Sequence, residues 1–128
     1  MPLFARALSA IALASLSSTA FADVGGAWRV TGEISGRKFT SDCRFDPRGS
    51  QIGGQCVALA TGDDKVKPGK LYKLTSGSVT GNQVQWGYPT KVFFMSVDIL
   101  FAGTLNGDRI GGTISAAGRK GNFTAVRK

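Results

Sequence analysis

The chain has two cysteines, and they stand at mirror-image positions about a turn-forming segment. Cys43 and Cys56 flank the segment RFDPRGSQIGGQ, whose midpoint falls between Gly49 and Ser50. If the flanking segments pair as an antiparallel hairpin about that midpoint, the cysteines lie directly opposite each other, close enough for a disulfide. We therefore predict an intra-hairpin disulfide in a β-rich fold. The same register predicts two further facing pairs, Phe45 with Gly54 and Ser41 with Ala58.

The residues between the cysteines also predict where the hairpin turns. Asp46, Pro47, Arg48 and Gly49 have the preferences of a type I turn, so we expect the turn there. A redox pair or a metal site is the alternative interpretation of two cysteines. The chain contains no histidine, which argues against that alternative.

Residues 1–22 have the pattern of a secretory signal peptide. Arg6 supplies a positive charge, an apolar run follows, and Ala20, Phe21 and Ala22 form a small-residue cleavage site. Cleavage after Ala22 would leave residues 23–128 as a single domain, periplasmic or secreted. The apolar run is too short to span a bilayer and no second one follows, so we expect no transmembrane segment. A buried N-terminal helix is the alternative interpretation.

After this leader, apolar and polar residues alternate and glycine recurs every few residues, a pattern typical of short antiparallel strands. Turn-forming pairs such as Gly81-Asn82 and Gly107-Asp108 predict tight hairpins. Because strands joined by hairpins pair with their neighbours, the expected order is an up-and-down meander. The eight expected strands cover residues 27–34, 38–45, 51–59, 70–79, 83–88, 91–105, 109–115 and 122–127.

An open sheet of eight such strands would expose one apolar face and two edges, whereas a closed sheet would bury the face and remove the edges. We therefore predict an all-β fold, a single eight-stranded antiparallel up-and-down meander β-barrel with one intra-hairpin disulfide. The aromatic residues expected to point inward are Trp28, Phe39, Phe45, Trp86, Tyr88, Phe93, Phe101 and Phe123.

The first expected strand begins with Gly26-Ala27-Trp28, and the last ends at Arg127. In a closed barrel these positions are neighbours, so the Arg127 guanidinium could cover the Trp28 indole and close that end. This resembles the G-x-W and terminal-arginine signature of the calycin superfamily, which includes lipocalins, fatty-acid-binding proteins and avidins. The chain also resembles uncharacterised exported bacterial proteins with a W-x-V opening, a cysteine hairpin and a G-x-I…G-x-F-T-A ending. The resemblance implies a lipocalin-like β-barrel domain over residues 23–128, shorter than typical lipocalins.

The composition excludes several kinds of chemistry. Without histidine the chain has no Ser-His-Asp or Cys-His nucleophilic machinery and lacks the usual ligand of zinc and haem sites. Asp63 and Asp64 are adjacent acids without the spacing of a calcium loop, which predicts a solvated turn. Lysine-based or paired-carboxylate catalysis is not excluded by composition, but the acids lie mostly at expected turns. We expect no catalytic residues, no metal and no cofactor, and predict a protein that is not an enzyme.

The inward aromatic residues and the calycin resemblance together predict an exported barrel that binds a small apolar ligand. An eight-stranded barrel has an interior just wide enough to be filled by side chains or to hold one small ligand. We expect a mainly filled interior with a shallow apolar pocket at the end opposite Trp28. The candidate ligand-binding residues are Trp86, Tyr88, Phe93 and Met95.

Two further functions fit the sequence. Phe94 and Leu100 are expected to point outward, where they could contact an envelope protein, as in inhibitor-type barrels, or a second copy of the chain. The excess of 16 Lys and Arg over 8 Asp and Glu could bind an anionic envelope polymer. The basic residues are spread along the chain in runs no longer than two, which favours a solvated basic surface and disfavours nucleic acid as a partner.

Overall fold

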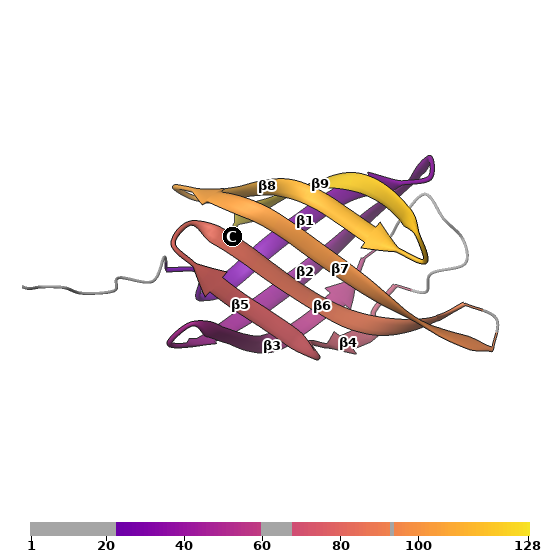
Figure 1. Cartoon of the computed structure of the whole chain (residues 1–128), viewed down its shortest axis with the longest axis horizontal. Helices are drawn as coiled ribbons and strands as arrows, with labels where there is room; N and C mark the ends of the chain where they lie inside the picture. Colours follow the sequence, from indigo (N-terminus) through magenta and orange to yellow (C-terminus); the bar gives the residue numbers. More distant parts are fainter. Residues whose placement is uncertain (1–22, 60–67, 93) are drawn as a thin grey trace, which may run out of the picture.

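The computed structural model describes residues 23–59, 68–92 and 94–128, which form β-strands and the turns between them (Figure 1). The predicted leader, the segment 60–67 with Asp63 and Asp64, and Phe93 lie outside the described residues. The described strands are β1 (Gly26–Ile34), β2 (Arg37–Arg48), β3 (Gln51–Ala58), β4 (Leu71–Lys73), β5 (Ser76–Thr80), β6 (Gln83–Val92), β7 (Met95–Asn106), β8 (Arg109–Ala116) and β9 (Arg119–Arg127).

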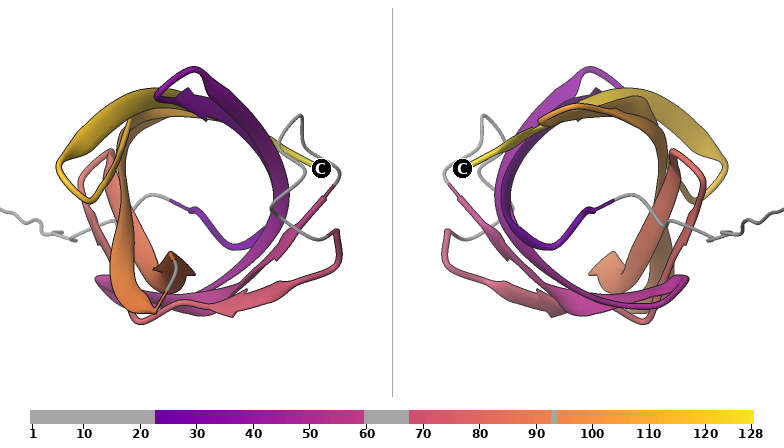
Figure 2. Two further views of the ribbon diagram at one scale, coloured as in Figure 1. Left: turned by 90° about the vertical axis from the view of Figure 1, so that its right-hand side faces the viewer. Right: turned by 90° about the vertical axis from the view of Figure 1, so that its left-hand side faces the viewer.

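The strands form one antiparallel sheet that closes on itself. Hairpin-connected strands pair with each other, and β9 pairs with β1 from Trp28 opposite Arg127 to Ile34 opposite Gly121. Two short strands, β4 and β5, pair with opposite ends of β3 and together occupy one strand position. The predicted eight-stranded up-and-down barrel is therefore confirmed, and Figure 2 shows its ring viewed along the axis.

The expected strand 70–79 is interrupted in the structure. Between β4 and β5 the Leu74 amide donates to the Gly54 carbonyl at 3.0 Å, whereas the next amide, of Thr75, donates to the Gly87 carbonyl at 2.9 Å. The chain thus changes partner strand within two residues. As a result β5 has five residue pairs with β6 but only one, Gln51 with Ser78, with β3.

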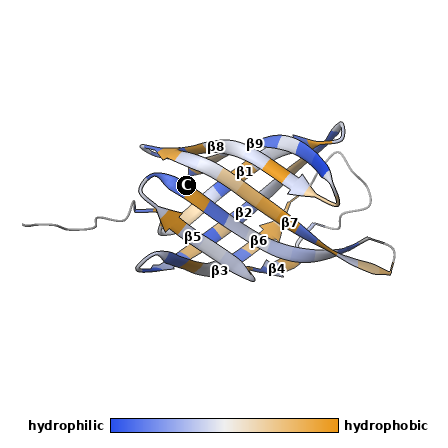
Figure 3. Cartoon of the chain, viewed as in Figure 1, coloured by the Kyte–Doolittle hydropathy of each residue, from blue (hydrophilic) through white to orange (hydrophobic). Residues whose placement is uncertain are grey.

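Alternation along the strands places one face of each strand inside the barrel. Figure 3 shows the alternation as changing bands of apolar and polar colour. Burying these apolar side chains is the main driving force for closure, at roughly 1.5–3 kcal/mol for each large side chain. The buried inward residues include Trp28 and Val30 on β1, Cys43 and Phe45 on β2, Ile52 and Cys56 on β3, Val84 and Trp86 on β6, Phe101 on β7, Ile110 and Ile114 on β8, and Phe123 and Ala125 on β9.

Aromatic rings fill the middle of the barrel. Trp86 stacks on Phe101 with ring centroids 4.9 Å apart, and Phe45 lies against the Trp86 ring at the same distance. Phe123 meets both Trp86 and Phe101 edge-on, at 5.2 and 5.3 Å. Rings from three other strands thus all contact Trp86, and this part of the interior is filled by side chains.

The β2–β3 hairpin has the predicted register. Cys43 lies opposite Cys56 and forms the disulfide, and the pairs Phe45 with Gly54 and Ser41 with Ala58 are also present. The predicted turn position was wrong, because β2 continues through Pro47 and the chain reverses at Gly49 and Ser50. Gly49 has a φ of +62°, a conformation that suits a two-residue hairpin turn and that glycine adopts without strain.

The β6–β7 hairpin extends beyond the rest of the barrel. Its ladder runs from Gln83 opposite Thr104 to Val92 opposite Met95, so Lys91 belongs to β6 and not to the following strand as expected. Neither the β8–β9 hairpin nor the β1–β2 hairpin reaches as far (Figure 1). Among the described residues, the end of the hairpin therefore has no neighbouring strand on either side.

Candidate ligand-binding site

One end of the barrel is closed by the first residues of the described chain. Residues 23–25 cross this end (Figure 2), and the Val24 side chain is fully buried there. The Trp28 indole Nε1–H donates to the Val24 carbonyl at 2.9 Å. We call this end the closed end.

Arg127 holds the crossing segment in place. Its guanidinium carbon lies 4.3 Å from the Trp28 ring centroid, so the structure has the contact that the sequence predicted. The same guanidinium donates to the carbonyls of Gly25 at 2.7 Å and Asp23 at 2.9 Å, and to the Asp108 carboxylate at 3.0 Å. One side chain therefore joins the first strand, the segment before it and the β7–β8 turn.

The sequence prediction named Trp28 and Arg127 but missed Val24. Val24 is the sole apolar side chain between the predicted cleavage site and Ala27. An isolated valine next to a G-x-W motif does not by itself predict a buried residue. Its burial can be predicted only when the adjacent end of the barrel is known to be open to solvent without it.

The opposite end contains a cavity of about 170 Å³, and we call this end the open end. Its position agrees with the expectation of a pocket opposite Trp28. Residues from β1, β2, β3, β4, β6, β7 and β8 form its wall. They are Ile34, Arg37, Lys38, Phe39, Thr40, Ser41, Ala58, Tyr72, Tyr88, Ile99, Phe101, Ile114 and Ala116.

Four aromatic rings make up much of the cavity wall. Tyr72 stacks on Tyr88 with centroids 4.7 Å apart, and Phe39 meets Phe101 edge-on at 6.1 Å. Phe101 is itself fixed from behind by Trp86. Ring–ring packing of this kind leaves the wall few alternative arrangements, so the cavity is largely preformed.

Two buried side chains of the wall, Ser41 and Tyr88, carry a polar group. Ser41 is 4% exposed, and its Oγ has no hydrogen-bond partner among the described groups. A buried hydroxyl without a partner is unfavourable and is uncommon in native structures. Tyr88 is also buried. Its burial raises the pKa of its phenol, and the neighbouring Tyr72 makes a smaller contribution in the same direction. Tyr88 therefore remains a neutral phenol at physiological pH.

Basic residues surround the mouth of the cavity. Arg37 and Lys38 line it directly, and Arg119 lies at the adjacent β8–β9 turn, where its Nη1 donates to Ser35 Oγ at 3.3 Å. Glu33 faces Lys38 across the β1–β2 ladder. The mouth therefore combines a positively charged rim with an apolar interior.

The four predicted ligand-binding residues have different positions. Tyr88 lines the cavity. Trp86 lies deeper in the barrel and does not line it, because Phe101 and Phe45 cover its ring. Met95 is 70% exposed on the projecting hairpin, so its expected inward position was wrong. Phe93 lies outside the described residues.

Some lining residues were not predicted as ligand contacts. Tyr72 lies in the expected strand 70–79, in which a single alternation is interrupted where the chain changes partner between β4 and β5. Ser41 and Ile99 share the faces of the inward aromatic residues Phe39 and Phe101, but a face does not indicate how near a residue lies to the end of the barrel. That position depends on strand stagger, which no local pattern in the sequence reports.

No metal site can be assigned from the described residues, in which no three His, Cys, Asp or Glu side chains form a group that could hold an ion. The same residues include no helix long and apolar enough to cross a membrane.

An antiparallel eight-stranded barrel with one end closed is consistent with a calycin-like fold. No protein-family model matches the chain, no curated protein matches its sequence, and no solved structure matches it.

Proposed function

We propose that the protein is a lipocalin-like binding barrel that holds a small, mainly apolar molecule in the cavity at its open end. The observation that carries the proposal is the aromatic-walled cavity with the unpartnered Ser41 hydroxyl inside it. Binding pockets combine a preformed apolar wall with a few polar groups that orient the ligand. The predicted signal peptide and the disulfide support an exported location for this binding barrel.

The volume of the cavity limits the size of the ligand. A dry apolar cavity of about 150 Å³ in another protein accepts benzene or xenon, and the present cavity is about 170 Å³. A single six-membered ring or a short branched chain fits this space. Fatty acids, retinoids and haem are too large to be enclosed by it.

The polar groups predict which small molecules bind best. A ligand with one hydroxyl or carbonyl group could bond to Ser41 Oγ and satisfy it, which an unsubstituted hydrocarbon could not. A net gain of about 1 kcal/mol for such a bond corresponds to a several-fold difference in dissociation constant. We therefore expect phenol to bind more tightly than benzene.

Titration of the protein with phenol and benzene, followed by NMR chemical shifts of the cavity residues, tests the proposal. Saturable binding of both compounds is expected, with phenol preferred. Ala58→Leu should abolish binding, because Ala58 lines the cavity and the larger side chain fills part of it. Ala102→Leu is the matched control, because Ala102 is exposed on the outside of β7.

Two results would contradict the proposal. One is the absence of saturable binding for either ring compound at accessible concentrations. The other is an Ala58→Leu variant that folds and binds phenol as well as Ala102→Leu does. Ser41→Ala adds a finer test, since it should remove the preference for phenol and leave the affinity for benzene unchanged.

A further inference from the structure

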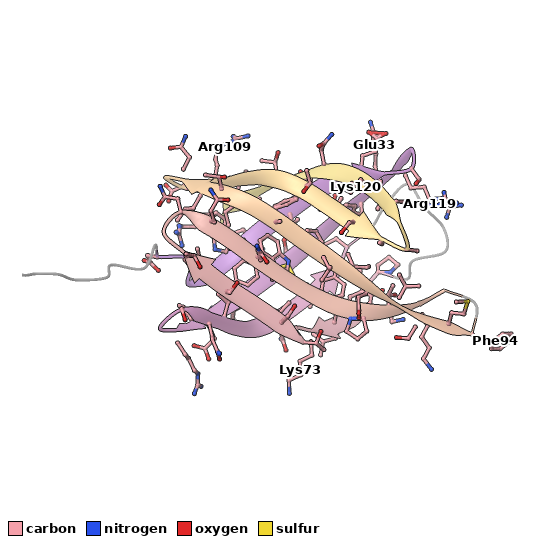
Figure 4. The ribbon with its side chains drawn as sticks, in the orientation of Figure 1. Glu33, Lys73, Phe94, Arg109, Arg119 and Lys120 are labelled. Carbon is pink, nitrogen blue, oxygen red and sulfur yellow. A yellow bond between two sulfur atoms is a disulfide. The ribbon has the colours of Figure 1, made fainter. Side chains whose placement is uncertain are left out.

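The projecting β6–β7 hairpin carries an apolar tip. Phe94 is 99% exposed and Met95 is 70% exposed, and Figure 4 shows Phe94 beyond the end of the barrel. Two large apolar side chains that remain in water at a protruding tip do not contribute to the stability of the fold. Exposed apolar groups of this kind mark contact sites for other molecules.

Basic side chains surround the same end of the barrel. Lys91 lies on the projecting hairpin, and further cations come from the β1–β2 turn region, the start of β4 and the β8–β9 turn. The structure gives no ion pair with a carboxylate for any of five cations in the described part of this end, Lys38, Lys70, Lys91, Arg119 and Lys120. We call these five residues the basic collar.

The described carboxylates around the collar do not neutralise it. Glu33 and Asp98 are the described acids on this half of the barrel, and both are exposed. Glu33 faces Lys38 across the ladder and Asp98 faces Pro89. Positive charge therefore predominates over the described part of the open end.

We infer that the open end docks on a bilayer surface that contains anionic lipids, with Phe94 and Met95 entering the interfacial region and the collar facing the headgroups. Apolar side chains contribute by leaving water, and each basic residue near an anionic leaflet strengthens binding about fivefold. Both contributions act at the same end of the molecule and in the same direction.

A bilayer suits this surface better than the other candidate partners do. A stable protein interface buries roughly 800 Å² on each side, whereas a convex tip with two apolar side chains offers far less. A second copy of the chain would bring its own basic collar against this one. An anionic polysaccharide matches the charge of the collar but offers no apolar layer for Phe94.

Sedimentation with lipid vesicles tests the inference, using the protein from Asp23 onward, which contains all the described strands. Vesicles of phosphatidylcholine with about one third phosphatidylglycerol should bind it, and added salt should weaken binding. Vesicles of phosphatidylcholine alone should bind more than about a hundredfold more weakly, because the contributions of all five collar residues are lost.

Two pairs of variants separate the tip from the collar. Phe94→Ser should weaken binding to the anionic vesicles about tenfold, whereas Val126→Ser removes an exposed apolar residue near the closed end and should change it less than about twofold. Lys120→Glu should also weaken binding about tenfold. Arg109→Glu makes the same change of charge at the opposite end (Figure 4) and should have little effect.

A thermal unfolding transition like that of the wild type shows that Phe94→Ser is folded, and this control keeps the experiment independent of the proposed cavity function. Equal losses for Phe94→Ser and Val126→Ser would overturn the inference. So would a protein that binds neither vesicle, or one whose self-association in light scattering disappears in Phe94→Ser, because the tip would then be a contact between copies.

Discussion

The two ends of this barrel are built from the same strands but are completed in different ways. At the closed end a crossing segment, a buried valine and the Arg127 guanidinium fill the space between the strands. At the open end the strands stop around a cavity that retains an unpartnered hydroxyl. The buried Trp28 Nε1–H of the closed end has a partner within the chain, whereas the Ser41 hydroxyl of the open end has none among the described groups.

The described ion pairs with carboxylates follow the same division, since all of them lie in the closed half of the barrel. Near the closed end, basic residues meet carboxylates, as in Arg29 and Lys128 with Asp42 and Arg127 with Asp108. The basic collar at the open end has no such partners in the described structure. A surface whose charges are already paired is suited to stability, and one whose charges are unpaired is suited to binding an oppositely charged partner.

The largest effect should come from removing the disulfide, which lies beside Trp28 in the β1–β2 ladder. Replacing both Cys43 and Cys56 by alanine should lower the free energy of unfolding by about 3 kcal/mol, because the unfolded chain regains the freedom of the closed loop. Urea denaturation of the oxidised protein and the variant measures the difference. A loss below about 1 kcal/mol would mean that the disulfide contributes little to this half of the barrel.

Arg127→Ala compares the two ends directly. It removes hydrogen bonds to two backbone carbonyls and the contact with Trp28, so we expect a loss of about 2 kcal/mol. Arg119→Ala at the open end removes one exposed hydrogen bond to Ser35 and should change stability by less than about 0.5 kcal/mol. Thermal unfolding of both variants checks the prediction, and equal losses would show that the ends do not differ in stability.

Acid should act on the closed half first. The Arg29 guanidinium, helped by Lys128, lowers the pKa of Asp42 from 3.8 to about 2 in the folded protein. Because the pKa is lower in the folded than in the unfolded state, the stabilisation is complete above pH 4 and is lost as the pH falls towards 2. The pair is partly exposed, so we expect a contribution of about 1 kcal/mol.

Asp42→Asn tests this pH dependence, because the variant should lose the part of the acid destabilisation that arises from Asp42. Urea midpoints at pH 4 and pH 2 measure it. The prediction fails if wild type and variant lose stability in parallel over this range. Glu33 at the open end has no ion pair in the described structure, and Glu33→Gln is the matched control.

Ser41→Ala should have the smallest effect on stability, and unlike the other substitutions it should not lower the free energy of unfolding. Because its hydroxyl has no partner in the structure, its removal should leave the free energy of unfolding unchanged or raise it by up to about 1 kcal/mol. Denaturation without added ligand measures this. A clear loss of stability would show that the Ser41 hydroxyl already has a hydrogen-bond partner in the protein without ligand. It would then not be available to bond to a polar group of a ligand.

The sequence predicted the features that depend on local alternation and on symmetry about a turn. The hairpin register around Cys43 and Cys56, the inward faces and the meeting of Trp28 with Arg127 all follow from period-two patterns in a closed meander. A short turn fixes which residues of a hairpin face each other, whereas the meeting of Trp28 with Arg127 also required the prediction that the barrel closes.

Other features depend on the length and stagger of neighbouring strands, which local patterns do not report. Met95 lies on the same face of β7 as the buried Phe101. It is nevertheless exposed, because its hairpin extends past the adjacent strands. The expected strand 70–79 breaks where Leu74 and Thr75 bond to different strands. Val24 is buried only because the barrel end lies next to it.

The bonds of Arg127 also bear on how the chain reaches its final form. They connect residues 102 and 104 positions apart, so the last described strand fixes the segment that precedes the first strand. Contacts of such wide sequence separation form slowly, because a long loop must be ordered before they are made. Closure of the ring is therefore expected to be a late step in folding.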